Sequence, residues 1–94
     1  NAQLVALLQY QRGLSVNRLA SLQYSFTRYG DDIGVLQSMG MGASSVTQRL
    51  VREQVTIGLE RDFERSVIEW HESKIANETL IGEKIHRTLG VALA

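Results

Sequence analysis

The chain of 94 residues contains no cysteine and no proline. Without cysteine it has no disulfides, thiolate nucleophiles or cysteine-ligated zinc, and we therefore expect a reducing, cytoplasmic environment. Because there is no proline, every residue has the backbone N–H that a helix interior requires. No apolar run approaches the roughly 20 residues of a membrane-spanning helix, so the sequence predicts no membrane-embedded segment.

The chain also lacks an excess of either charge, because ten basic residues balance ten acidic ones. Binding to nucleic acid or to an anionic membrane surface usually requires a basic patch, which this balance does not favour. Residues 14–20 have a faint helix-turn-helix pattern, but residues 24–29 do not supply the turn and recognition helix that should follow. A DNA-binding regulator is therefore a less favoured alternative.

The signals that are present indicate helices throughout. We expect a long helix over about 45–89, with Ser44 or Ser45 as its N-cap and Gly90 as its stop. A first helix is expected over about 3–29, ended by Gly30, and a glycine-rich connector with a short helix over about 30–43. Residues 77–82 are a possible break in the long helix. The sequence thus predicts a single all-α domain over 1–94, a helical hairpin with one long C-terminal helix.

Two rows of apolar residues run along the long helix at helical spacing. The first row contains Val51, Val55, Leu59, Phe63, Val67 and Trp70. The second row contains Leu50, Ile57, Ile68 and Ile75. Together they form a stripe wider than a two-stranded coiled-coil seam, which indicates neighbours on two sides. Because the first helix is too short to cover the long one, we expect a homodimeric helical bundle. Its predicted interface consists of Val55, Leu59, Phe63, Val67 and Trp70, with Trp70 as the expected hot spot.

Few residues suggest chemistry. Glu83 and His86 have the Glu-x-x-His spacing of carboxylate-bridged metal sites in helix bundles, although they are also typical of a solvated last helical turn. His71 lies between Glu69 and Glu72, which makes it either a ligand-binding or pH-sensing residue or a boundary residue beside the core. No nucleophile–histidine pair and no phosphate-binding glycine loop is recognisable. We expect no catalysis and no cofactor.

Residues 4–15 resemble the opening helix of nitrate- and nitrite-sensing helical domains, which carry a Leu-Gln-x-Glu-Arg-Gly-Leu-Ser-like run. The resemblance covers about a dozen residues, and Gln11 stands where that family has glutamate. It implies that Arg12 is an anion contact. The alternative interpretation is an ordinary helix that contains a glycine, and it is the one that we prefer.

Taken together, these patterns predict a protein–protein interaction or regulatory module that homodimerises through its long helix. Another protein is the alternative partner. The alternative is a helical domain that senses a small anion between its helices, near Arg12 or His71. A carboxylate–metal bundle is less favoured.

Overall fold

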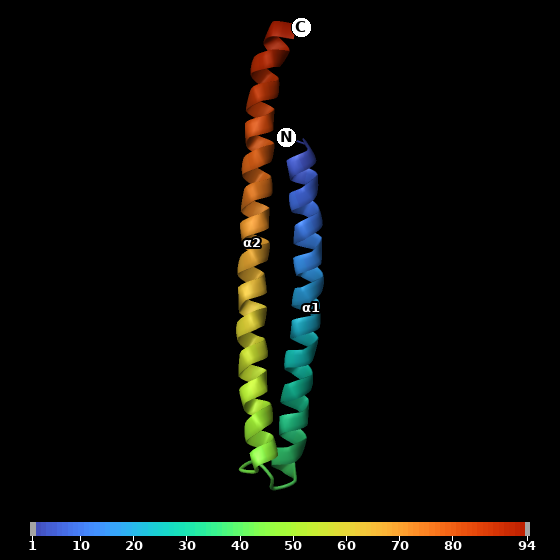
Figure 1. The fold of residues 1–94 in the computed structure, drawn as a ribbon, viewed down its shortest axis with the longest axis vertical. Coiled ribbons are helices and arrows are strands. Elements are labelled where there is room, and N and C mark those ends of the chain that lie inside the picture. Colours follow the sequence, from blue (N-terminus) through green and yellow to red (C-terminus); the bar gives the residue numbers. More distant parts are fainter. Residues whose placement is uncertain (1, 94) are drawn as a thin grey trace.

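The computed structural model describes residues 2–93, and the side chains of residues 2–90. Helix α1 (Ala2–Ser38) and helix α2 (Ser45–Leu93) pack side by side in opposite directions. They form a rod that measures 76 by 15 by 14 Å (Figure 1). The predicted all-α helical hairpin is therefore confirmed. No described helix has an apolar stretch long enough to cross a lipid bilayer.

The two helices meet along a seam whose residues alternate in steps of three and four. This spacing keeps one face of each helix turned towards its neighbour, as in coiled coils. On α1 this alternating run contains Ser15, Leu19, Leu22, Phe26, Tyr29, Ile33 and Leu36, and Leu8 lies one heptad before it. On α2 it contains Thr47, Leu50, Gln54, Ile57, Arg61, Glu64, Ile68, His71, Ile75 and Glu78, all buried or half-buried. The second apolar row of the sequence thus faces α1.

Helix α1 is longer than the expected 3–29, because it continues through Gly30 and includes the segment expected to form a separate short helix. Gly30 does not end the helix; it lets α2 approach closely. A Cβ atom at Gly30 would lie 3.0 Å from the side-chain amide nitrogen of Gln54. That amide donates a hydrogen bond of 3.2 Å to the carbonyl oxygen of Phe26, one turn earlier. Gly30 is thus a site of close helix–helix contact and not a helix end.

The end of α1 is formed by Gly40, whose φ of 76° is the left-handed conformation that glycine adopts most easily. The N–H of Gly40 donates to the carbonyl of Gln37, and the N–H of Met41 donates to that of Leu36. This pair of bonds is a Schellman motif, which satisfies carbonyls that the helix end would leave free. The chain then turns within a few residues.

The N-cap of α2 is Ser44. Its hydroxyl accepts a hydrogen bond of 3.2 Å from the N–H of Thr47. The hydroxyl of buried Thr47 donates in turn to the carbonyl of Met41, at 2.7 Å. These bonds fasten the turn to the first residues of α2 and so fix where the two helices begin to pair.

Helix α2 runs without a break through residues 77–82 and extends well past the start of α1 (Figure 1). It has 49 residues whereas α1 has 37. At 1.5 Å per residue, the difference corresponds to about 18 Å of helix. Over this length α2 has no α1 beside it, as expected from the unequal helix lengths.

Candidate interaction surface

The inside of the hairpin contains little apolar core. Among the described residues only Leu8 and Ile33 are buried large apolar side chains, while Ser15 and Thr47 are the most deeply buried. Two helices alone offer each other one face, so most of the larger side chains in the seam are only half-buried. Packing within one chain therefore uses only a part of its apolar surface.

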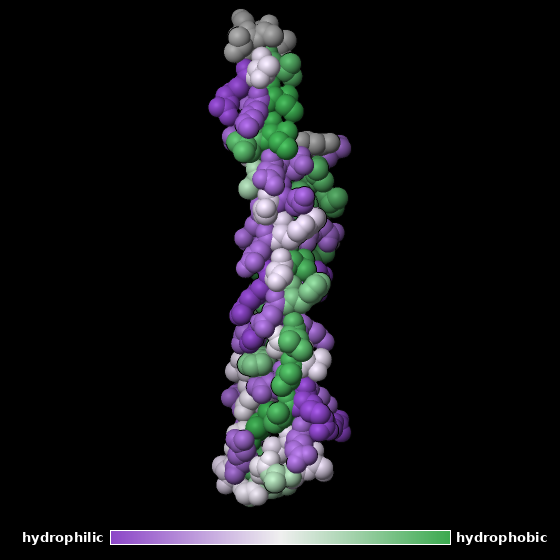
Figure 2. Space-filling view, turned by 90° about the vertical axis from the view of Figure 1, so that its left-hand side faces the viewer, coloured by the Kyte–Doolittle hydropathy of each residue, from purple (hydrophilic) through white to green (hydrophobic). Residues whose placement is uncertain are grey.

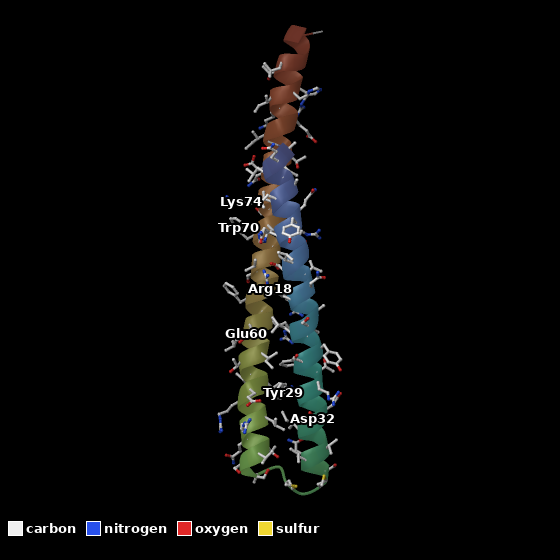
Figure 3. The ribbon with its side chains drawn as sticks, turned by 45° about the vertical axis from the view of Figure 1, so that its right-hand side comes forward. Arg18, Tyr29, Asp32, Glu60, Trp70 and Lys74 are labelled. Carbon is white, nitrogen blue, oxygen red and sulfur yellow. The ribbon has the colours of Figure 1, made fainter. Side chains whose placement is uncertain are left out.

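Polar contacts across the seam take the place of a larger core. Arg18 donates to Glu64 at 3.1 Å, and the guanidinium of Arg61 lies 4.4 Å from the centre of the Phe26 ring. The hydroxyl of Tyr29 donates to a carboxylate oxygen of Glu53 at 2.7 Å. In Figure 3, Arg18 and Tyr29 belong to α1 and lie on its side facing α2. These bonds specify how the two helices pair.

The contact between Tyr29 and Glu53 shifts the protonation of both groups. The hydrogen bond from the Tyr29 hydroxyl, together with one from Arg49 at 3.1 Å, lowers the pKa of Glu53 below its ordinary value of 4.5. The same hydrogen bond to Glu53 raises the pKa of Tyr29 above 10.0. Both shifts favour the neutral phenol and the charged carboxylate, the pair that the hydrogen bond requires.

The first apolar row lies on the outside of α2. It includes five residues at steps of four, which we call the outer ridge: Val51, Val55, Leu59, Phe63 and Val67. Leu59 is 67% exposed and Phe63 is 68% exposed, whereas Val67 is half-buried. In the heptad defined by the seam, Leu59 occupies the position directly opposite α1. The predicted interface residues are thus brought together on a surface that the chain does not itself cover.

Trp70 continues this surface, three residues beyond Val67. Its ring is exposed, meets the ring of His71 edge-on at 5.1 Å, and has the ammonium group of Lys74 at 5.6 Å. Tryptophan is among the residues that contribute most often to interface hot spots.

The outer ridge crosses α2 obliquely. Figure 2 shows an apolar band that climbs at an angle across the α2 side of the rod, with polar side chains on both sides. Four residues exceed one helical turn by about 40°, so each member of the ridge is displaced sideways from the one before. The ridge therefore passes from one flank of α2, over its outer face, to the other flank.

On that second flank the ridge borders a groove between the two helices, with a volume of about 750 Å³. Leu22, Leu59 and Phe63 supply its apolar lining, and the charged groups of Arg18, Glu60 and Glu64 surround them. Sequence reasoning missed this groove, because it exists only where a face of α1 lies next to a face of α2. The signal that could have found it is the register of the two heptad patterns.

The candidate ligand residues Arg12 and His71 lie at the same level of the hairpin. The Nε of Arg12 is 3.1 Å from Glu72, the residue that follows His71. The Nδ1–H of His71 donates to the carbonyl of Val67 at 2.8 Å. Both side chains thus have partners within the protein. The guanidinium of Arg12, which the family resemblance implies as an anion contact, is paired with the carboxylate of Glu72.

The candidate metal residues Glu83 and His86 lie where α2 extends past α1, and both are exposed. Within the described part of the chain, no three histidine or acidic side chains converge in a way that could hold a metal ion. A four-carboxylate site would need ligands from neighbouring helices, and within one chain none lies beside this stretch of α2.

Comparisons with protein-family models, with curated proteins and with solved structures find no match to this chain.

Proposed function

We propose that this hairpin is a non-catalytic protein–protein interaction module that homodimerises through the outer face of α2. The exposed outer ridge supports this proposal most directly. Five apolar side chains spaced four residues apart, followed by Trp70, form a surface that runs from one flank of α2 across its outer face to the other flank. Apolar surfaces of this kind mark interaction sites in folded proteins.

The total accessible surface supports the same conclusion. The chain exposes 6858 Å². A compact monomer of 10.5 kDa is expected to expose about 5,400 Å². The excess of about 1,400 Å² exceeds the roughly 800 Å² that one partner buries in a standard interface. One additional contact surface of this size would thus remove more than half of the excess.

Sedimentation equilibrium of the wild-type chain, over a range of concentrations, tests the proposal. We expect a monomer–dimer equilibrium that Phe63→Ala weakens at least tenfold, because a ring that is exposed in the monomer is buried in the dimer. Trp70→Ala should weaken it in the same way. Tyr24→Ala is the matched control, since Tyr24 is also 68% exposed but lies on the outer face of α1.

The control variant should leave the dissociation constant unchanged. Circular dichroism of each variant, expected to show wild-type helicity, separates a loss of association from a loss of folding. A wild-type chain that remains monomeric up to millimolar concentration would contradict the proposal, and so would an equal effect of Phe63→Ala and Tyr24→Ala.

A further inference from the structure

From the oblique path of the outer ridge, we infer that two copies of this chain pack α2 against α2 at a crossing angle of about 50°, with Leu59 at the two-fold axis. The two hairpins would then form an X and not a four-helix bundle with aligned axes. This inference rests on the proposed homodimerisation and adds to it the geometry of the contact.

The first reason is the spacing of the ridge. Residues at steps of four lie on a line inclined by about 26° to the helix axis, whereas an aligned bundle requires alternate steps of three and four. When two such lines run side by side, the inclinations add and the axes cross at about 50°. The α1-facing seam of α2 has the alternating steps of three and four, whereas the outer ridge of the same helix has steps of four only.

The second reason is that the ridge is suited to a second copy of itself. A two-fold axis at Leu59, with the two helices in opposite senses, sets Val55 near Phe63 of the partner subunit and Val51 near Val67 of the partner subunit. Each pair joins two apolar side chains, and Leu59 meets its own counterpart. Leu59 lies directly opposite the seam, so a helix that crosses there meets α2 without displacing α1.

The third reason is the distribution of charge around the ridge. Outside the α1-facing seam, residues 48–56 carry two arginines and one glutamate, while residues 60–69 carry three acidic residues and one arginine. The antiparallel sense brings the basic half of one copy towards the acidic half of the other. The parallel sense would bring the basic half of one copy towards the basic half of the other, and the acidic half towards the acidic half. Opposite charges across an interface fix the sense of pairing.

Disulfide trapping tests the centre of the contact. Because the chain has no cysteine, a single Leu59→Cys variant carries one thiol per copy. At the two-fold axis the two thiols lie within disulfide reach, so mild oxidation should convert most of the dimer to a covalent dimer. Tyr24→Cys, with nearly the same exposure but on α1, should remain uncrosslinked at the same concentration.

Spin labels test the angle. Ser45 and Ser73 both share the heptad position of Leu59, fourteen residues before it and after it. In an X-shaped antiparallel dimer, the backbone at Ser45 lies about 20 Å from that at Ser73 of the partner subunit, whereas aligned helices bring them to about 12 Å. Double electron–electron resonance on a doubly labelled S45C/S73C chain distinguishes these two distances. Dilution with unlabelled chain is the control, because it leaves only the distance within one chain.

The outcomes distinguish the two proposals. A covalent Leu59→Cys dimer and the longer label distance support the crossed geometry. A dimer in sedimentation whose Leu59→Cys variant stays uncrosslinked, or whose labels show the shorter distance, overturns the crossed geometry and leaves homodimerisation intact. A chain that is monomeric throughout overturns both.

Discussion

Phe26 of α1 packs against the bare backbone of Gly58 on α2. A Cβ atom at Gly58 would lie 3.1 Å from the ring, which the guanidinium of Arg61 covers from another side. Gly58 is buried although it has no side chain, because the ring occupies the space that a side chain would need. A glycine that weakens the helix in isolation is thus a site of close helix–helix contact.

We predict that Gly58→Ala lowers the free energy of unfolding, since the gain in helix propensity is smaller than the cost of moving a ring held on two sides. Gly34→Ala is the matched control, because no atom lies within 4 Å of the added methyl group. It should raise the free energy of unfolding by about 0.5–1 kcal/mol. Urea denaturation at one protein concentration measures both. Equal effects of the two substitutions would show that the Phe26 contact is unimportant.

The cap of α2 gives a second prediction. Ser44→Ala should lower the free energy of unfolding by about 1 kcal/mol, because the N–H of Thr47 loses its acceptor. Ser45→Ala should change it by less than about 0.5 kcal/mol, as expected for an exposed residue within the first turn. Thermal unfolding of the two variants under identical conditions compares them. A larger effect at Ser45 would contradict the assignment of Ser44 as the N-cap and would indicate that Ser45 is the cap.

A third prediction concerns Glu64, whose side chain is only 14% exposed. One carboxylate oxygen accepts from Arg18, and the other is buried without a hydrogen-bond partner among the described residues. Glu64→Leu should therefore raise the free energy of unfolding by about 1–2 kcal/mol, because it removes an unsatisfied buried oxygen. Arg18→Ala should lower it, since the carboxylate stays buried but loses its ion partner. A Glu64→Leu variant less stable than wild type would refute this account of the seam.

The pH dependence of stability should reveal the bond between Tyr29 and Glu53. The pKa of Glu53 is lower in the folded state than in the unfolded chain, so its contribution is present above about 4.5 and is lost as the pH falls through the folded value. The pKa of Tyr29 is raised, so its contribution is complete below 10.0 and is lost as the pH rises through the folded value.

The Tyr29→Phe variant isolates this bond. Its midpoint of urea unfolding should decline less than that of wild type, both on the acid side and on the alkaline side. The variant keeps the ring in the seam and loses only the hydroxyl, so packing is nearly unchanged. Parallel acid and alkaline profiles for the two proteins would mean that the hydrogen bond does not contribute to stability.

The fold could be predicted from local signals, because helix period, cap residues and the absence of proline act over a few residues. The same local spacing predicts Leu59 and Phe63 as apolar positions on one face of α2. Which of the two apolar rows faces α1 could not be predicted, since both have helical spacing. The choice depends on register, which the contacts of Phe26 with Gly58 and of Gln54 with the α1 backbone determine.

The role of Gly30 also could not be predicted from local sequence signals. Glycine ends helices and also allows close helix contacts, and only the position of Gln54 opposite Gly30 decides between the two. The groove near Leu22 and Phe63 likewise depends on residues about forty positions apart in the chain. Sequence spacing identifies the faces of single helices, whereas pairing between helices decides which face is used.

The length of the rod determines how the protein behaves in solution. Its radius of gyration is 21.7 Å, whereas a compact domain of this length is expected to have about 12 Å. Translational friction rises with elongation, so one such hairpin should elute from a gel-filtration column well ahead of a globular standard of 10.5 kDa. An early elution volume is therefore the expected property of the single chain, and stoichiometry has to be determined from mass-sensitive detection such as light scattering or sedimentation.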